Sequence, residues 1–205
     1  MKKTLLQSLS VACLCTAFSL SAAAEPVIGQ PAPQFEGMTT SGQTISLADL
    51  KGTPVMLEWT NHGCPYVQKH YDGGNMQKTQ RALTEDGVVW LSIISSAPGT
   101  QGHVSPEGAD ELTASRGAYP SHVVLDPEGT IGRLYDAKTT PHMFLINASG
   151  TLEYMGAIDD KPSARPSSLE GAHNYALAAW DEVKAGKPVS ESNTKPYGCT
   201  VKYAE

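Results

Sequence analysis

The sequence predicts an α/β fold, a mixed central sheet with helices on both faces, followed by a C-terminal helix and tail. Three observations lead to this class. Apolar runs rich in β-branched residues at 55–59, 88–94 and 123–125 are typical of strands buried on both faces. Helical stretches alternate with these runs, which is the pattern of partly parallel sheets. A hairpin pattern at 143–155 then adds antiparallel strands.

The first half of the chain is read from its turn residues and apolar runs. Cys64 and Pro65 open the first helix, since proline's fixed φ and missing N–H suit the first helical turn. Asp72-Gly73-Gly74-Asn75 is a strong turn signal that interrupts the helix. The elements predicted here are an extended arm with a short strand pair within 25–47, a single turn at 48–52, a strand at 55–59, a helix from 65 and a helix at 76–85.

The second half continues the alternation. Ser105 and Pro106 are an N-cap and a first-turn proline for a helix that ends near Gly117. The predicted elements are a strand at 88–94, a loop at 97–103, a helix at 105–116, a strand at 123–125 closed by a turn at 126–129, a short helix at 131–135, and hairpin strands at 143–146 and 152–155.

A final helix is predicted to start at Ser167, with Glu170 completing a capping box. It follows a linker between Pro162 and Pro166 and stops at Gly186. Its apolar side chains form one stripe: Leu169, Ala172, Ala176, Leu177, Trp180 and Val183. The tail at 189–205 is polar and without period, and it carries Cys199.

Residues 1–24 have the pattern of a cleavable signal peptide: a basic start, an apolar segment and three alanines before Glu25. We therefore expect a periplasmic protein without a membrane anchor after cleavage, with one domain at 25–188 and a tail at 189–205. Its 21 acidic residues exceed its 15 basic ones, a formal charge of −6, which argues against nucleic acid as a partner.

Cysteine usage narrows the chemistry. Cleavage would remove Cys13 and Cys15 and leave Cys64 and Cys199, and an even pair in an exported chain favours a disulfide. Cys64 lies between a buried strand and a helix start, where free N–H groups and the helix dipole favour the reactive thiolate. The alternative for Cys64 is a buried structural cysteine.

Three segments, taken in order, resemble the thioredoxin-like redoxins: the strand into Cys64-Pro65-Tyr66-Val67, the Thr139-Thr140-Pro141 step before a strand, and Ala157-Ile158-Asp159. Among these the chain is most similar to the alkyl hydroperoxide reductase/thiol-specific antioxidant (redoxin) family and its periplasmic thiol-disulfide relatives. The resemblance covers about Gly29 to Asp160 and implies a thioredoxin-like fold.

The resemblance also implies site residues. Cys64 matches the nucleophilic cysteine, and Pro141 matches a cis-proline that exposes the backbone of Thr140 to extended substrate chains. Glu58 matches a buried acid. A carboxyl group inside an apolar strand would have a raised pKa and could exchange a proton with the thiol. Alternatively, Glu58 lies at the rim of the sheet with a lysine partner.

The sequence departs from the family patterns in several places. Val67 stands where a dithiol oxidoreductase has its second cysteine, so Cys64 has no partner one helical turn away. Leu57 and Asn61 stand where peroxiredoxins have a proline and a threonine or serine, and Thr60 could replace that hydroxyl in part. For the activating arginine of peroxiredoxins, Arg116 and Arg133 are weak candidates.

The leading interpretation is an oxidoreductase with antioxidant activity and no cofactor. Its Cys64 thiolate would attack a protein disulfide or a peroxide, and Cys199 would resolve the intermediate by forming a redox-active disulfide. A static Cys64–Cys199 disulfide is the alternative, with a stabilisation of about 2–4 kcal/mol. Two other classes stay open: a copper or zinc carrier using His62, Cys64 and His142, and a non-catalytic binding or chaperone-like module.

Overall fold

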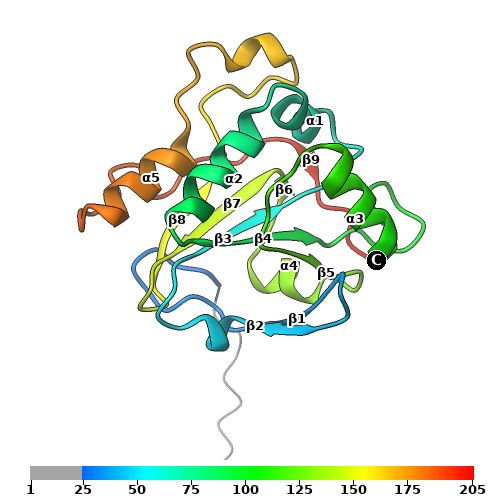
Figure 1. Ribbon diagram of the computed structural model, residues 1–205, viewed down its shortest axis with the longest axis horizontal. Helices are drawn as coiled ribbons and strands as arrows, with labels where there is room; N and C mark the ends of the chain where they lie inside the picture. Colours follow the sequence, from blue (N-terminus) through cyan, green and yellow to red (C-terminus); the bar gives the residue numbers. More distant parts are fainter. Residues whose placement is uncertain (1–24) are drawn as a thin grey trace, which may run out of the picture.

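The computed structural model describes residues 25–205; the predicted signal peptide, with Cys13 and Cys15, lies outside the described residues. Within that range seven strands form one mixed sheet in the order β2-β1-β5-β4-β3-β7-β8 (Figure 1). The strands are β1 (Glu36–Thr39), β2 (Thr44–Ser46), β3 (Val55–Trp59), β4 (Val89–Ile94), β5 (His122–Leu125), β7 (His142–Ile146) and β8 (Leu152–Gly156). The predicted mixed sheet is therefore confirmed.

The centre of the sheet is parallel and its edges are antiparallel. β3, β4 and β5 run parallel, with Leu57 beside Leu91 in the register. β7 lies antiparallel to β3, and β8 continues antiparallel from β7. The apolar run of β3 is buried along its whole length, because both faces of the central strands are covered.

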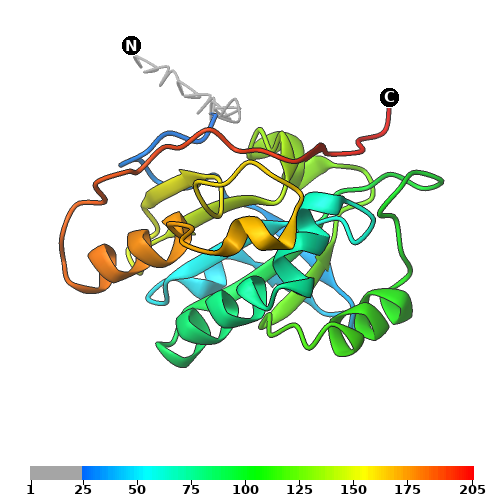
Figure 2. The ribbon, with the colours of Figure 1, turned by 90° about the horizontal axis from the view of Figure 1, so that it is seen from above.

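Helices cover both faces of this sheet (Figures 1 and 2). One face carries most of them: α1 (Pro65–Asp72), α2 (Asn75–Glu85), α3 (Pro106–Ser115) and α5 (Tyr175–Lys184). The other face carries α4 (Thr130–Leu134) and the N-terminal segment. Side chains alternate along each strand, so Met56 and Trp90 belong to the core under α1, α2 and α5, whereas Leu57 and Leu91 belong to the core under α4.

Local signals place most helix ends correctly. The Ser105 hydroxyl accepts a hydrogen bond from the N–H of Gly108 at 3.1 Å and caps α3, with Pro106 at its first position. The predicted interruption after α1 is confirmed, since Gly74 has a φ of +71° and separates α1 from α2. Ser46 caps the predicted single turn, a 3₁₀ helix at Leu47–Leu50.

The predicted start of the final helix at Ser167 is wrong. Pro166–Leu169 is only a 3₁₀ turn, and α5 begins at Tyr175. Gly171 has a φ of +65°, which stops any helix there, and the Asn174 side chain caps α5 by accepting from the N–H of Leu177 at 3.0 Å. Leu169 and Ala172 are therefore not part of the helical stripe.

The tail at 189–205 is more ordered than its composition predicts. It runs back across the molecule from the end of α5, and its Cys199–Thr200 segment forms a strand, β9, antiparallel to β6 (Thr139–Thr140). In Figure 2 the tail, drawn in red, runs along one side of the molecule from the end of the orange helix α5 to the C-terminus. Farther on, the N–H of Ala97 donates to the carbonyl oxygen of Lys202. The tail is thus fastened on both sides of Cys199.

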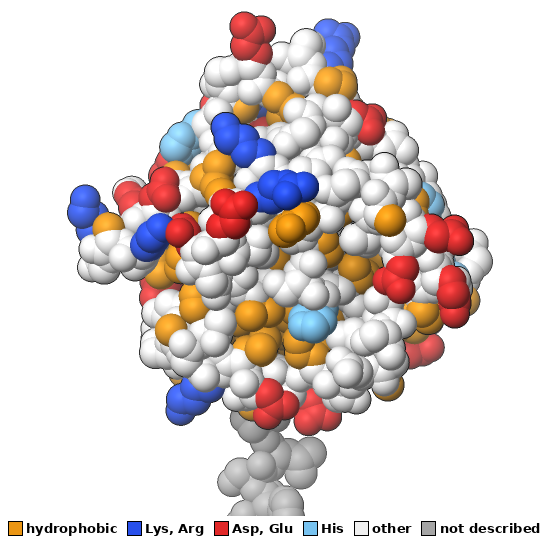
Figure 3. Space-filling view, in the orientation of Figure 1, with side chains coloured by type: hydrophobic (Ala, Val, Ile, Leu, Met, Phe, Trp, Pro, Cys, Tyr) orange, Lys and Arg blue, Asp and Glu red, His pale blue; other side chains and the backbone are white. Residues whose placement is uncertain are grey.

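Charged side chains are spread over the surface. On the face shown in Figure 3, acidic and basic side chains are scattered among neutral ones. No helix within residues 25–205 is long and apolar enough to span a bilayer.

Candidate active site

Cys64 is the N-cap residue of α1, at the point where β3 has ended. It is fully buried and has extended backbone angles, with φ −80° and ψ 122°. Asn61 shapes the turn: its side-chain oxygen accepts from the N–H of Gly63 at 2.9 Å, and its carbonyl oxygen accepts from the N–H of Cys64 at 3.0 Å. The sulfur therefore lies at the N-terminal end of a helix, as predicted.

The loop before β7 lies against this sulfur. The Thr140–Pro141 peptide bond is cis, as the resemblance implies. The Cys64 thiol donates a hydrogen bond to the carbonyl oxygen of Thr140 at 3.2 Å, and Thr140 is itself buried. The fold thus brings Cys64, Thr140 and Pro141 together from positions far apart in the sequence.

Cys199 lies on the other side of the same sulfur. β9 pairs Cys199 with Thr140, and the backbone N–H of Cys199 donates to the Cys64 sulfur at 3.4 Å. Both cysteines are free thiols in this structure. In this structure the protein's own tail pairs with the Thr140 backbone, and binding of an extended substrate chain at that edge stays a prediction.

Gly198 permits this close approach. Its φ is +142°, and a Cβ placed on it would lie 2.0 Å from the carbonyl oxygen of Thr140. Any larger residue would push the tail away from β6. Gly198 is therefore the position that allows Cys199 to reach Cys64.

The two thiols differ electrostatically. Burial opposes ionisation of Cys64, but the neighbouring Cys199 thiol and the N–H groups of Val67 and Cys199, which favour the thiolate, outweigh it, so the pKa of Cys64 is lowered. Burial, a hydrogen bond to Cys64 and the charge of Cys64 raise the pKa of Cys199 to about 12. Cys64 is the thiol that ionises first.

Glu58 is fully buried in β3, so the alternative that places it at the sheet rim with a lysine is wrong. Its carboxylate accepts hydrogen bonds from four neutral donors: Tyr71 Oη at 3.0 Å, Gln80 Nε2 at 3.1 Å, Trp90 Nε1 at 3.0 Å and Ser92 Oγ at 2.8 Å. None of the hydrogen bonds described for residues 25–205 joins Glu58 to Cys64. Proton exchange between the two stays a prediction.

The two histidines considered for a metal site, His62 and His142, have different surroundings. His142 packs on Phe144, with ring centroids 4.4 Å apart, and burial lowers its pKa to about 3. Its Nδ1 accepts from the N–H of Lys138 at 3.3 Å. His62 lines a recess with Arg116. In the part of the chain that the structure describes, no three His, Cys, Asp or Glu side chains are grouped to hold a metal ion.

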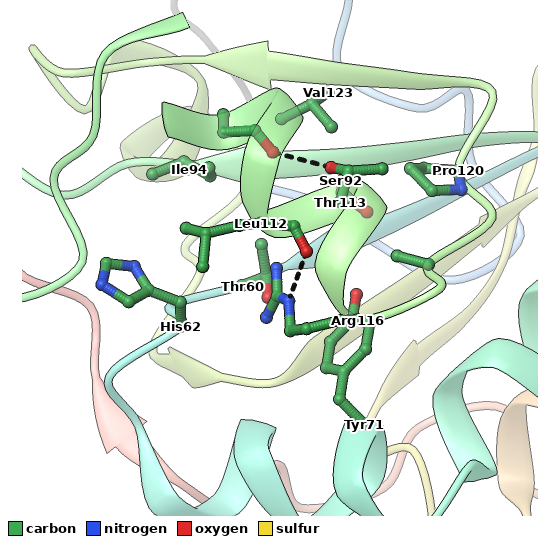
Figure 4. A pocket seen from close by; sticks show the side chains of 12 residues that line it. Thr60, His62, Tyr71, Ser92, Ile94, Leu112, Thr113, Arg116, Pro120 and Val123 are labelled. Carbon is green, nitrogen blue, oxygen red and sulfur yellow. Dashed lines mark hydrogen bonds between the residues drawn. The ribbon is translucent and has the colours of Figure 1, made fainter. Parts of the chain in front are cut away.

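That recess lies between α3 and the ends of the central strands (Figure 4). It leaves about 10 Å³ of enclosed space, the room of one water molecule. The Thr60 hydroxyl lines it, is buried and has no hydrogen-bond partner among the described residues. Arg116 lies over the Tyr71 ring at 4.1 Å, and its Nε donates to the carbonyl oxygen of Leu112. No described contact joins Arg116 to Cys64.

The sequence matches the AhpC/TSA family over residues 28–155, a range that includes Cys64, Thr140 and Pro141 but not Cys199. The chain belongs to the AhpC/TSA family. A comparison with curated protein sequences gives no match.

Solved structures show the same thioredoxin-like fold. A hypothetical protein from Sinorhizobium meliloti 1021 has a TM-score of 0.74 at 23% identity, covering 88% of this chain and 97% of the other. An uncharacterized conserved protein from Geobacillus kaustophilus has a TM-score of 0.73 at 23% identity, covering 87% and 93%. A candidate thiol:disulfide interchange protein, DsbE, from Chlorobium tepidum has a TM-score of 0.52 at 24% identity, covering 64% and 85%.

The second arginine considered for this AhpC/TSA protein, Arg133, serves the tail. It lies 4.6 Å from the centre of the Tyr203 ring and donates to the carbonyl oxygen of Ala204. It belongs to α4, on the face opposite α1. Neither of the two candidate arginines therefore contacts Cys64 in this structure.

Sequence reasoning missed one buried polar cluster beside the site of this AhpC/TSA protein. Lys69 and His70 of α1, Asp159 after β8, and Tyr197 of the tail meet under the surface, and the first three are at most 1% exposed. We call this group the tail anchor. A lysine in a helix is usually exposed to solvent, so the sequence does not indicate that Lys69 is buried. The signal that could have indicated the cluster is Tyr197-Gly198-Cys199, an aromatic residue, a glycine and a cysteine in an otherwise polar tail.

Proposed function

We propose that this protein is a thiol-based oxidoreductase in which Cys64 is the nucleophile and Cys199 resolves the oxidised intermediate. The observation that carries this proposal is the hydrogen bond from the N–H of Cys199 to the Cys64 sulfur, with β9 paired beside it. A resolving thiol must reach the sulfur it attacks. The tail strand places Cys199 next to that sulfur before any reaction begins.

The electrostatics fit these two roles. The lowered pKa of Cys64 increases its thiolate fraction at neutral pH, and the thiolate is the attacking form. Part of the rise in the pKa of Cys199 comes from the hydrogen bond and the charge of Cys64. Oxidation of Cys64 removes that charge, so Cys199 ionises more easily at the stage when it must attack.

With a peroxide, the Cys64 thiolate attacks one peroxide oxygen and the O–O bond breaks. The sulfur becomes a sulfenic acid, and the leaving alkoxide or hydroxide takes a proton. The Cys199 sulfur then attacks the Cys64 sulfur, the S–O bond breaks and water leaves. With a disulfide substrate, Cys64 forms a mixed disulfide, and Cys199 displaces the second substrate thiolate. Both routes end in a Cys64–Cys199 disulfide that an external dithiol reduces.

A protein partner would meet a covered site. β9 already pairs with Thr139 and Thr140, and Cys64 is fully buried. An extended chain would have to displace the tail before pairing there, whereas a peroxide needs only a small opening. Small oxidants are thus the substrates that this closed arrangement favours, and an external thiol partner then acts on the oxidised, rearranged protein.

The test is oxidation of the reduced protein followed by intact mass and peptide mapping. One equivalent of hydrogen peroxide, or of a small organic disulfide, should lower the mass by that of two hydrogens and join the peptides that carry Cys64 and Cys199. Dithiothreitol should restore the original mass, and a second addition of oxidant should repeat the cycle. The rates with the two oxidants then tell which substrate class is preferred.

Two results would count against this assignment. If both thiols stay reduced with either oxidant, the pair is not redox-active. If the bond forms once and withstands dithiothreitol in the folded protein, it is a static crosslink. A Cys199→Ser variant serves as the control, because it should stop at a sulfenic acid or mixed disulfide on Cys64.

We also propose that the protein acts in the periplasm. The support is the signal-peptide pattern of residues 1–24. Fractionation of cells that make the full chain, with N-terminal sequencing of the product, tests this: a periplasmic chain that starts at Glu25 is expected, and an unprocessed cytoplasmic chain would contradict it.

A further inference from the structure

The tail anchor fastens the tail two residues before Cys199. Lys69 Nζ donates to Tyr197 Oη at 3.0 Å and to the carbonyl oxygen of Lys161 at 2.8 Å. The Tyr197 hydroxyl donates a hydrogen bond to a carboxylate oxygen of Asp159. One hydroxyl therefore links the tail to α1 and to the segment after β8.

His70 is the third hydrogen-bond partner of the Tyr197 hydroxyl, after Lys69 and Asp159. The Asn75 amide contacts Nδ1 of His70 at 2.8 Å, and Nε2 of His70 contacts Tyr197 Oη at 3.2 Å. Burial and the neighbouring Lys69 lower the pKa of His70 to about 3, so the ring is neutral at pH 7. With Asn75 donating to Nδ1, the ring proton lies on Nε2 and points to Tyr197.

The charges of the tail anchor are balanced inside the protein. Lys69 Nζ lies 3.6 Å from Asp159 Oδ2, and both side chains are at most 1% exposed. Burying two such groups is costly unless they are paired and hydrogen-bonded, and a tyrosine hydroxyl between them is part of what satisfies them. Removing Tyr197 from this position would leave Lys69 and Asp159 short of a partner.

The anchor and the nucleophile share one helix. Cys64 is at the N-cap position of α1, and Lys69 and His70 lie among the eight residues of this helix. The tail returns to this helix at Tyr197 and reaches Cys64 through Gly198 and Cys199. Figure 1 shows β9 passing directly beside α1. The position of Cys199 relative to Cys64 is thus set by contacts to the element that also carries Cys64.

From this geometry we infer that Lys69, Asp159 and Tyr197 are positioning residues that hold Cys199 against Cys64, so that oxidised Cys64 reacts with the tail rather than with an external thiol. This inference rests on the proposed function, because it specifies how the resolving step of the same site is favoured. A cysteine held in place reacts as an intramolecular partner at high effective concentration. A loosened tail loses that advantage.

The experiment measures which thiol reacts with oxidised Cys64: Cys199 or an external thiol. Reduced protein is treated with hydrogen peroxide in the presence of 2-mercaptoethanol, quenched by acid and alkylation, and weighed. The ratio of Cys64–Cys199 disulfide to mixed disulfide is the readout. For Tyr197→Phe we expect this ratio to fall by roughly tenfold or more relative to the original protein. The circular dichroism of the reduced variant should match that of the original protein, which shows that the variant is still folded.

Tyr203→Phe is the matched control. Tyr203 lies in the same tail beyond Cys199, and its hydroxyl donates to the carbonyl oxygen of Ala137 at 2.7 Å, outside the tail anchor. We expect this variant to keep the ratio of the original protein. A second variant, Asp159→Asn, still accepts from Tyr197 but has no charge opposite Lys69, and we expect a fall in the ratio smaller than that of Tyr197→Phe.

The outcomes separate the inference from the function beneath it. If the original protein forms no Cys64–Cys199 disulfide, the proposed function fails. If it forms that disulfide and Tyr197→Phe leaves the ratio unchanged, only the positioning role is overturned. If Tyr203→Phe lowers the ratio as much as Tyr197→Phe, the effect comes from the tail as a whole, and the specific role of the anchor is also overturned.

Discussion

Replacing Cys64 with serine should slow the reaction with peroxide and with disulfides by roughly 1,000-fold or more, to the background rate. A serine hydroxyl is not ionised at neutral pH and lacks the nucleophilicity of a thiolate. The fold should survive, because a hydroxyl in this position can still donate to the carbonyl oxygen of Thr140 and accept from the N–H of Cys199. Peroxide consumption and cleavage of a small disulfide, each with an external dithiol present, measure the effect.

Cys199→Ser should act at the second step only. The first oxidation of Cys64 should keep its rate within a few-fold, and turnover with a dithiol should fall because Cys199 no longer resolves the intermediate within the protein.

Equal first-step rates in Cys64→Ser and the original protein would refute the role of Cys64. Equal losses of stability by about 2–4 kcal/mol in both serine variants, with no loss of reactivity in either, would instead indicate a structural crosslink.

Replacing Glu58 with leucine should lower the free energy of unfolding by about 3–5 kcal/mol. Four buried donors, on Tyr71, Gln80, Trp90 and Ser92, lose Glu58 as an acceptor, and leucine offers them none. Gln80 Nε2 keeps only the Tyr71 hydroxyl at 3.2 Å. Each unsatisfied buried group costs about 1–3 kcal/mol, and partial rearrangement offsets some of the sum. Urea denaturation followed by tryptophan fluorescence or circular dichroism measures the change.

Glu58→Gln is the matched control for this effect. Its amide oxygen can replace Oε2, which accepts from Gln80, Trp90 and Ser92, and its amide nitrogen can donate to the Tyr71 hydroxyl. We therefore expect a loss of only about 1–2 kcal/mol. Because Glu58 has no described contact with Cys64, the rate of Cys64 oxidation should stay within a few-fold in this variant. A large drop in that rate at unchanged stability would establish the proton-exchange role instead.

The sheet and the position of Cys64 were predictable from the sequence, because each depends on local or strongly patterned signals. The cis bond before Pro141 was implied by the resemblance to the thioredoxin-like redoxins and not by a local pattern. A continuous run of apolar residues predicts a buried strand such as β3, and Cys64-Pro65 predicts a helix start. The final helix was placed too early, since Ser167 and Glu170 imitate a capping box. Gly171 and Asn174 decide the true start through backbone angle and a side-chain cap.

The tail and its anchor could not be predicted in the same way. The pairing of Cys199 with Thr140 joins residues 59 positions apart in the chain, 199 − 140, and leaves no periodic pattern in a two-residue strand. The buried Lys69 and Asp159 are satisfied in part by Tyr197, which comes from the distant tail. The environment of Glu58 is similar: four donors from three further elements make burial of its carboxylate possible.

The reduction potential of the Cys64–Cys199 pair tests the central claim most directly. The protein is equilibrated in glutathione buffers of defined ratio, quenched with an alkylating agent and weighed, and the fraction oxidised is plotted against the potential of the buffer. A redox-active pair should titrate reversibly between about −120 and −270 mV, the range of thiol–disulfide catalysts. A potential below about −300 mV, as for structural disulfides, or two thiols that stay reduced throughout, would contradict the account.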